Sequence, residues 1–290
     1  MSKDMKLLSH FRLNRSSLFI LLLLTGTAVI FMLPVVYIIS TAFKPLSELF
    51  LFPPRFFVQN PTTQNFNDFM QAADTSIVPF SRFLFNSAVV TFFSVSTALF
   101  ISSLCAYAFS RMDFPGKKWL FSLIIIALMF APEAVVITRF LVVSQLGIIN
   151  TYFGHILPHI AVPVGVFLMK QFMDQIPASL SEAARIEGAG EFTIYWRIIM
   201  PNVMPAVGAV MIIVFQAVWM DNVSSVLYMT DESMRTLPYF VSTLTAAIGT
   251  DVARQGAAAA AGFIMFMPNF LLFAVLQKSM IETMVTSGIK

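Results

Sequence analysis

The sequence predicts an all-α integral membrane protein with six transmembrane helices. Of its 290 residues, 58% are hydrophobic and 11% are charged. Soluble globular proteins carry about 25% charged residues, so this composition excludes that class. Apolar stretches of about 20 residues recur, which is the length a helix needs to cross the core of a bilayer. The predicted spans are residues 17–40, 83–110, 119–139, 152–172, 203–222 and 257–279.

The first span follows a basic segment, a combination that is also typical of a signal peptide. Its apolar run continues to Ile39, too long for a signal peptide, and no A-x-A-like cleavage site follows. We therefore expect a retained span. Residues 1–16 are predicted to be a cytoplasmic tail, and residues 17–290 a single transmembrane domain.

The other five spans are apolar runs bounded by charged or helix-breaking residues. The second ends before Arg111, the third ends at Arg139, and Pro201 and Pro205 mark the start of the fifth. The sixth opens with seven small residues, Gly256–Gly262. Small residues let helix backbones approach closely in lipid, which predicts either a tight contact within the bundle or a seam between two chains.

The distribution of basic residues predicts the orientation. Six crossings place both termini on one side, and the cytoplasmic side is expected to carry the excess of Lys and Arg. Of the 18 basic residues, 4 lie in the N-terminal tail, 3 in the loop after the second span, 3 in the loop after the fourth and 2 at the C-terminal end. These segments share one side, and the opposite side holds the remaining 6. Both termini and the loop 174–201 are therefore predicted to be cytoplasmic.

The loop 174–201 is polar and predicts two short helices joined by a glycine turn. Ser179 and Glu182 have the spacing of a capping box, in which each side chain bonds the backbone N–H of the other. Gly188 and Gly190 are expected to end this helix, because glycine readily adopts the left-handed conformation. A second amphipathic helix is expected to follow along the membrane surface, with four large apolar side chains at helical spacing, Phe192, Tyr195, Trp196 and Ile199.

These residues resemble the signature of the inner-membrane permeases of ABC importers. The signature contains Glu-Ala-Ala, a glycine after three more residues, and Ile-x-Leu-Pro after another nine. The matching positions are Glu182, Ala183, Ala184, Gly188, Ile198 and Pro201, with Met200 in place of the leucine. Other stretches resemble the carbohydrate-uptake branch that contains the maltose permease pair, in particular its second subunit. They are residues 43–45, 86–87, 106–109, 114–117, 146–151 and 235–238, and Pro268.

The resemblance implies the fold and mechanism of a type I importer permease with six transmembrane helices. In that family the loop forms a coupling helix seated on a cytoplasmic ATPase subunit, and closure of two ATPases moves the bundle from inward- to outward-facing. The implied ATPase-coupling residues are Ser179, Glu182, Ala183, Ala184, Glu187, Gly188 and Pro201.

The resemblance also implies the partners: a second, related permease, two ATPase subunits and an extracytoplasmic solute-binding protein, in a bacterial inner membrane. The chain has no G-x-x-x-x-G-K-[ST] phosphate loop, so we expect a transport subunit rather than an enzyme. It is expected to bind no cofactor, with ATP and magnesium held by the partner subunits. A net charge of +3, scattered over span ends, argues against nucleic acid as a partner.

Two acidic residues are candidates for the pathway or for contact with the binding protein. Glu133 and Asp221 are predicted near the outer ends of the third and fifth spans, and ionisable residues inside spans are costly. They could equally face an outer vestibule or cap a broken helix. His155 and His159 lie four residues apart but have no evident third ligand, so no metal site is predicted.

Other function classes fit the sequence less well. A stand-alone secondary transporter would need internal repeats or an ion-coupling carboxylate at mid-membrane, and neither is evident. A membrane enzyme would need a nucleophile and base, and no such pair is visible. An ABC permease for a non-sugar solute such as glycerol phosphate is a further alternative.

The relatives often have Trp-Asn-Asp before an aromatic residue, whereas this chain has Trp219-Met220-Asp221-Asn222, which puts an inherited role for Asp221 in doubt. Some oligosaccharide importers share this change. It favours a large oligosaccharide as substrate, with an acidic one such as an alginate fragment as a hypothesis.

Overall fold

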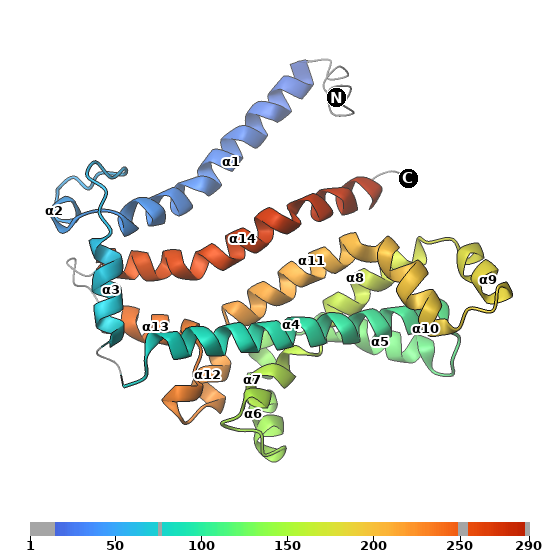
Figure 1. Ribbon diagram of the computed structural model, residues 1–290. Helices are drawn as coiled ribbons and strands as arrows, with labels where there is room; N and C mark the ends of the chain where they lie inside the picture. Colours follow the sequence, from blue (N-terminus) through green and yellow to red (C-terminus); the bar gives the residue numbers. More distant parts are fainter. Residues whose placement is uncertain (1–14, 75–76, 249–254, 288–290) are drawn as a thin grey trace. The chain divides into compact units, whose positions relative to one another are not determined.

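A computed structural model of the protein describes residues 15–74, 77–248 and 255–287. These residues form helices and connecting loops and contain no strand (Figure 1). The predicted tail lies outside the described residues, except for residues 15 and 16. The chain divides into two compact units, Met1–Phe69 with Thr250–Phe263, and Met70–Gly249 with Ile264–Lys290. Each unit is described separately.

In the first unit, one asparagine caps the end of the first long helix, α1 (Arg15–Ala42). The last carbonyls of a helix have no partner within it. The side-chain nitrogen of Asn65, in α3 (Gln64–Asp74), donates to the carbonyls of Thr41, Ala42 and Lys44 at 3.4, 2.9 and 2.7 Å. Gly256, near the start of α14 (Gln255–Ser287), leaves room for this amide, because a Cβ there would lie 2.2 Å from the Asn65 oxygen.

The small residues at the start of α14 make a close contact within this unit, as one of the two predictions had it. Ala257, Ala260 and Ala261 are buried, the last two completely. Beside them, the rings of Phe43, Phe66 and Phe263 pack against one another with centroids 5.1 to 6.0 Å apart. Close packing of this kind supplies the attraction between helices in lipid, where the hydrophobic effect is absent.

A buried carboxylate organises the loop that follows α2 (Leu46–Leu49). Glu48 accepts the backbone N–H groups of Gln59 at 3.0 Å and Asn60 at 2.8 Å, and the Asn60 side chain at 3.1 Å. These bonds, led by that from Gln59, favour the ionised form and lower the pKa of Glu48 below its ordinary value of 4.5.

The second unit is built around the long helix α4 (Phe80–Arg111), which lies beside α8 (Pro163–Asp174) and α11 (Met200–Trp219) (Figure 1). Their facing side chains form the main core. At the start of α4, the Asn86 amide donates to the carbonyls of Ser233 and Arg235 and accepts from Tyr152, each at 2.8 Å. This satisfied polar cluster fixes the loop 231–236 against the first turns of α4.

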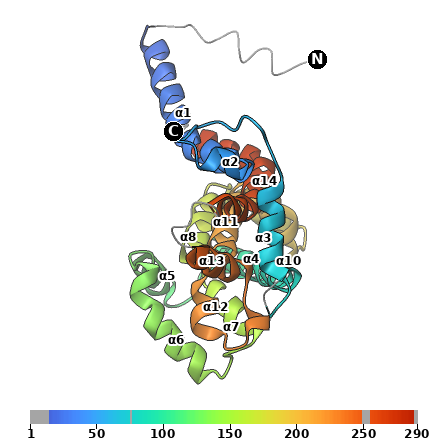
Figure 2. The same ribbon diagram turned by 90° about the vertical axis from the view of Figure 1, so that its left-hand side faces the viewer.

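The predicted third and fourth spans are each a bent pair of helices rather than one continuous helix. The third consists of α5 (Lys117–Ala127), the 3-10 turn η3 (Pro132–Val135) and α6 (Val136–Gln145), with a bend of 105° (Figure 2). The fourth consists of α7 (Tyr152–Ile156), the 3-10 turn η4 (Leu157–His159) and α8, with a bend of 44°. Both breaks contain proline. Proline interrupts a helix because it lacks the N–H that the helix interior needs.

The fifth span begins earlier than predicted. A continuous helical run joins α10 (Glu191–Ile194), a π-helical turn η5 (Tyr195–Ile199) and α11, so Pro201 and Pro205 lie inside it rather than at its start. The π turn widens the backbone just before Pro201, which accommodates the ring and the missing N–H. The unit also contains α12 (Val223–Tyr228), η6 (Glu232–Met234), α13 (Leu237–Ile248) and the remainder of α14.

Among the described residues, four helices are long and apolar enough to cross a membrane: Ser16–Ala42, Phe80–Arg111, Glu191–Trp219 and Gln255–Gln277. The two bent pairs raise the number to six if each pair crosses once. That count agrees with the six predicted spans.

Candidate functional site

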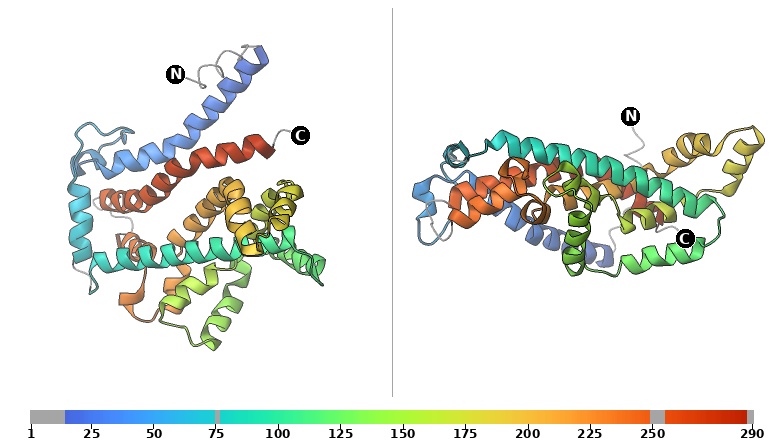
Figure 3. Two further views of the ribbon diagram at one scale, coloured as in Figure 1. Left: turned by 45° about the vertical axis from the view of Figure 1, so that its right-hand side comes forward. Right: turned by 90° about the horizontal axis from the view of Figure 1, so that it is seen from below.

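The predicted coupling loop forms an elbow at the end of the unit where α4 ends (Figure 3). We use "elbow" for α9 (Ala178–Ile186), the turn 187–190 and α10. The prediction of a capping box was wrong. Ser179 is the second residue of α9, Pro177 occupies the N-cap, and no side chain caps the helix. Pro177 has a proline's fixed φ, here −55°, so the helix begins directly after it and leaves Ser179 inside the first turn.

The turn after α9 is a Schellman motif. Gly188 has a φ of +83°, its N–H bonds the Arg185 carbonyl at 3.0 Å, and the N–H of Ala189 bonds the Ala184 carbonyl at 2.9 Å. These bonds satisfy two of the last carbonyls of α9. The prediction that Gly188 ends this helix in the left-handed conformation is confirmed. Gly190 is different, because its φ is −73° and it stands at the N-cap of α10.

The two faces of α9 differ in exposure. Ser181 and Ala184 are buried against the unit, whereas Glu182, Ala183 and Glu187 are exposed. The exposed side also carries large apolar groups, Leu180 at 47% and Ile186 at 88% exposure. Exposed apolar groups beside acidic ones, on a loop outside the spans, are typical of a surface that binds another protein.

The segment after the turn anchors the elbow. Tyr195 and Ile199 are buried, and the Tyr195 hydroxyl bonds Ser103 of α4 at 2.7 Å. Phe192 and Trp196 are exposed at 67% and 45%. The predicted amphipathic character is therefore present, but on a helix that is continuous with the fifth span rather than separate from it.

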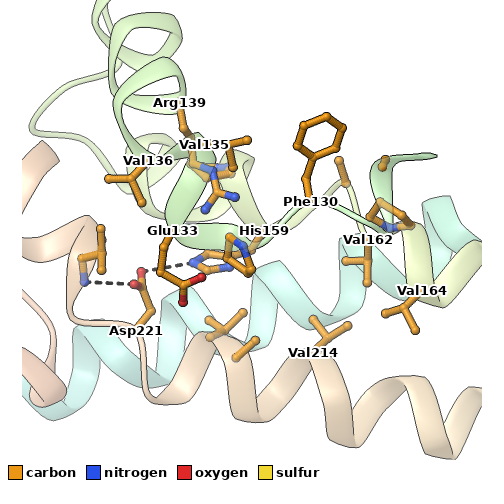
Figure 4. A pocket seen from close by; sticks show the side chains of 18 of the residues that line it. Phe130, Glu133, Val135, Val136, Arg139, His159, Val162, Val164, Val214 and Asp221 are labelled. Atoms are coloured by element: carbon orange, nitrogen blue, oxygen red, sulfur yellow. Dashed lines mark hydrogen bonds and ion pairs between the residues drawn. The ribbon is translucent and has the colours of Figure 1, made fainter. Parts of the chain in front are cut away.

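A second site is a pocket of about 590 Å³ between the two broken spans and α11 (Figure 4). Its walls are mainly apolar and include Phe130, Val162 and Val214. Both breaks line it, through Pro132 and Glu133 on one side and Pro158 and His159 on the other. Irregular backbone at membrane depth is tolerated where it is buried in protein or lines a water-filled cavity, and both of these breaks line the pocket.

The pocket brings together both predicted acidic residues. Glu133 lies on η3, and Asp221 lies two residues beyond the end of α11. Asp221 Oδ2 is 3.1 Å from His159 Nε2, and Oδ1 accepts the backbone N–H groups of Val223 at 3.0 Å and Ser224 at 3.4 Å. One of its functions is therefore to hold the start of α12, as the alternative of a capping role predicted.

Within the described part of the chain, the side chain of Glu133 makes no hydrogen bond or ion pair, and neither does that of the pocket's Arg139. Both side chains are therefore available for a polar ligand. His155 lies elsewhere, buried between the Ser224 hydroxyl at 2.8 Å and the Met234 carbonyl at 3.0 Å. No group of three His, Cys, Asp or Glu side chains placed to hold a metal occurs in residues 15–74, 77–248 and 255–287.

Sequence reasoning missed the pairing of His159 with Asp221 and the place of Arg139 in the pocket. Arg139 was counted as an outer basic residue at the end of a straight third span. The signal was Pro132 within that span, which indicated that the helix would break and that Arg139 would turn with the following segment.

Residues 98–280 match the family of binding-protein-dependent transport system inner membrane components. The chain belongs to this family. The galactooligosaccharides transport system permease protein GanQ of Bacillus subtilis (strain 168) is 30% identical over 295 residues, covering 100% of both chains. The arabinooligosaccharides transport system permease protein AraQ of the same organism is 29% identical over 265 residues, covering 91% of this chain and 92% of AraQ.

The fold is that of an ABC importer permease. A chain in the crystal structure of a bacterial ABC transporter that imports the acidic polysaccharide alginate superposes with a TM-score of 0.75 at 19% identity, over 96% of this chain and 98% of that one. A second alginate transporter structure, in complex with an alginate pentasaccharide-bound periplasmic protein, gives a TM-score of 0.59 at 14% identity. At such identities the similarity establishes the fold alone.

Proposed function

We propose that this chain is one half of a two-permease pathway that moves an oligosaccharide into the bacterial cytoplasm. Two separate ATPase subunits drive the movement, an extracytoplasmic binding protein delivers the sugar, and both termini and the elbow face the cytoplasm. ATP and magnesium are held by the ATPases, since the sequence has no phosphate loop. The observation that carries the proposal is the elbow, a helix ended by a Schellman turn with an exposed acidic and apolar face.

The ATPase docks on the exposed face of α9. Glu182, Ala183 and Glu187 point away from the unit, and the exposed Ile186 adds apolar surface for the contact. Ser179 lies exposed in the first turn of the same helix. Ala184 and Pro201 act from behind this face. Ala184 packs α9 on the unit, and its carbonyl accepts the Ala189 N–H of the turn. Pro201 follows the π turn.

The pocket is the part of the sugar path that belongs to this subunit. Glu133 and Asp221 supply acceptors for sugar hydroxyls, Arg139 supplies donors, and Phe130 offers an aromatic face. With two carboxylates, one guanidinium and one histidine, the pocket has no excess of positive charge. It therefore suits a neutral oligosaccharide better than a polyuronate, which agrees with the substrates named for GanQ and AraQ.

A docking experiment tests the elbow. The chain is co-expressed with the partner permease and ATPases, and the complex is purified through a tag on this chain. Glu182→Arg reverses a charge on the docking face and is expected to release most of the ATPase. Glu232→Arg is the matched control, since Glu232 is an exposed carboxylate near the other end of α4. Equal ATPase recovery with both variants would contradict docking on α9.

A transport experiment tests the pathway and the substrate class. Proteoliposomes with the complex and its binding protein are offered galacto-oligosaccharides, arabino-oligosaccharides and alginate oligomers, with and without internal ATP. We expect ATP-dependent uptake of a neutral oligosaccharide and a loss of uptake with Glu133→Ala. Uptake without the ATPases would instead identify a secondary transporter, and uptake of alginate oligomers alone would overturn the neutral assignment.

A further inference from the structure

One stripe of α4 contacts the coupling loop at three successive points. Ser103, Tyr107 and Arg111 are spaced four residues apart, so their side chains lie along the same side of the helix. Ser103 bonds the hydroxyl of Tyr195, after the elbow. Arg111 donates to the carbonyls of Met173 and Ile176, directly before α9. Tyr107, the middle member, reaches the elbow itself.

The contact of Tyr107 is made through Glu191, the first residue of α10. One carboxylate oxygen of Glu191 accepts the Tyr107 hydroxyl at 2.6 Å, and the other accepts Arg185 Nε at 2.8 Å. Tyr107 is 4% exposed and belongs to the core, whereas Arg185 is in the last turn of α9. Glu191 thus joins the C-terminal end of α9 to the middle of the stripe.

The two ends of α9 are therefore held by the same helix. Arg111 holds the segment that leads into α9, and the Tyr107–Glu191–Arg185 chain holds its far end. A helix fixed at both ends cannot swing relative to the body that holds it without breaking one attachment. The Arg185–Glu191 pair is the exposed part of this attachment, with both side chains 43% exposed, so the pair adds little to folding stability. The bond from the Tyr107 hydroxyl is part-buried.

Helix α4 in turn contacts the pocket wall. It packs against α7 and against η4, which carries Pro158 and His159 into the pocket. A displacement of the elbow that is passed to α4 therefore reaches the break in the fourth span. Spatial contact alone does not establish such transmission, so the attachment itself has to be perturbed.

The geometry points to Glu191 as a positioning residue that fastens the elbow to α4, so that α9 and α4 move as one body when the ATPases close. The inference rests on the proposed function, because it concerns how the docked elbow passes its movement to the spans. It assigns Glu191 no direct contact with the ATPase. Its role is exerted through Tyr107 and Arg185.

The first arm of the test measures the attachment without any partner. The full chain carries Cys105→Ser with spin labels at Asp113→Cys, just after α4, and Ile186→Cys, at the end of α9, and is studied in lipid nanodiscs. The distance between labels is measured by pulsed electron resonance. We expect a single narrow distance in this chain and the loss of that narrow distribution with Glu191→Ala. Glu232→Ala removes a carboxylate of similar exposure (49%) from another arginine pair and is expected to change nothing.

Two further measurements separate positioning from folding. The circular dichroism of Glu191→Ala is expected to match that of the parent chain, and its unfolding temperature is expected to fall only slightly, because one part-buried hydroxyl loses its carboxylate partner. Tyr107→Phe removes one hydroxyl and is expected to broaden the same distance. Superimposable distances in the parent chain and Glu191→Ala would overturn the inference.

The second arm uses the unlabelled, assembled complex and counts galacto-oligosaccharide molecules imported per ATP hydrolysed. Glu191→Ala is expected to retain the ATPases and to hydrolyse ATP, while the import per ATP falls several-fold. Glu191→Gln, which keeps an acceptor for Tyr107, is expected to lie between. A proportional loss of ATP hydrolysis and import would indicate a folding defect instead and overturn the positioning role. If the parent chain binds no ATPase, the proposed function fails, and the first arm still decides whether Glu191 fastens the elbow.

Discussion

Replacing Gly188 with alanine isolates the contribution of backbone conformation to the elbow. A Cβ at Gly188 or at Gly190 would meet nothing within 4 Å, so neither substitution causes a clash. The two positions differ in φ, which is +83° at Gly188 and −73° at Gly190. The pair therefore provides a variant and a matched control within one turn.

The expected magnitude follows from the cost of a left-handed conformation. An L-residue at positive φ is disfavoured by about 1–2 kcal/mol, which corresponds to a roughly 5–30-fold shift in a local equilibrium. At Gly190, alanine loses roughly 0.5–1 kcal/mol as an N-cap and gains about as much from the restricted unfolded chain, so the net effect is about zero. Asparagine tolerates the left-handed region, and Gly188→Asn is expected to lie between glycine and alanine.

Hydrogen–deuterium exchange of the elbow measures this effect directly. The Ala189 N–H is bonded to the Ala184 carbonyl only while the turn is intact. Gly188→Ala is expected to accelerate its exchange roughly 5–30-fold, with Gly190→Ala near the parent rate. ATPase recovery in the docking experiment should fall in the same order. Equal exchange rates for the two alanine variants would refute the assignment of the turn to the left-handed glycine.

Three other substitutions test the packing and polar contacts. Gly165→Ala places a Cβ 2.9 Å from Ser102 Oγ and should lower the free energy of unfolding by about 1–3 kcal/mol. Adding Ser102→Ala to the same chain should recover part of this loss, and no recovery would contradict the contact. Asp221→Ala should lower the free energy of unfolding by about 0.5–2 kcal/mol, because the first N–H groups of α12 lose their acceptor. Asp221→Asn keeps that acceptor but weakens the pair with His159, and should cost less. Equal unfolding temperatures for the two variants would argue against this role of Asp221. Because the pKa of Glu48 is lowered in the folded chain, its contribution to folding stability is complete above pH 4.5 and is lost as the pH falls through the lowered pKa. The two loop amides bound to it should therefore lose protection from hydrogen exchange on acidification. Glu48→Gln should abolish that pH dependence.

The family and the elbow were predictable from local features of the chain. Apolar length predicted the spans, because a helix must satisfy its own backbone in lipid and needs about 20 residues to cross. The spacing from Glu182 to Pro201 predicted the coupling loop, and Gly188 was identified because left-handed turns select glycine. These properties depend on residues close together in sequence.

The start of α9 and the shape of the fifth span were not predicted correctly. The S-x-x-E spacing of Ser179 and Glu182 fits a capping box, but a box also needs Ser179 to precede the first helical residue, and Pro177 moves that residue forward. The prolines at 201 and 205 were interpreted as a boundary. A π turn instead carries the helix through them, supported by the buried Tyr195 and Ile199. Local propensity gave way to packing against α4.

The amino-acid sequence was sufficient to predict a six-span permease whose polar loop turns at Gly188, because hydrophobic length and glycine conformation act locally along the chain. The juxtapositions that give the elbow and the pocket their proposed functions required the fold. Glu133 and Asp221 are 88 positions apart, and they line one pocket only because two spans break at prolines and turn toward α11. Tyr107 and Glu191 meet because α4 and the elbow pack together, a long-range contact that no spacing in the chain encodes.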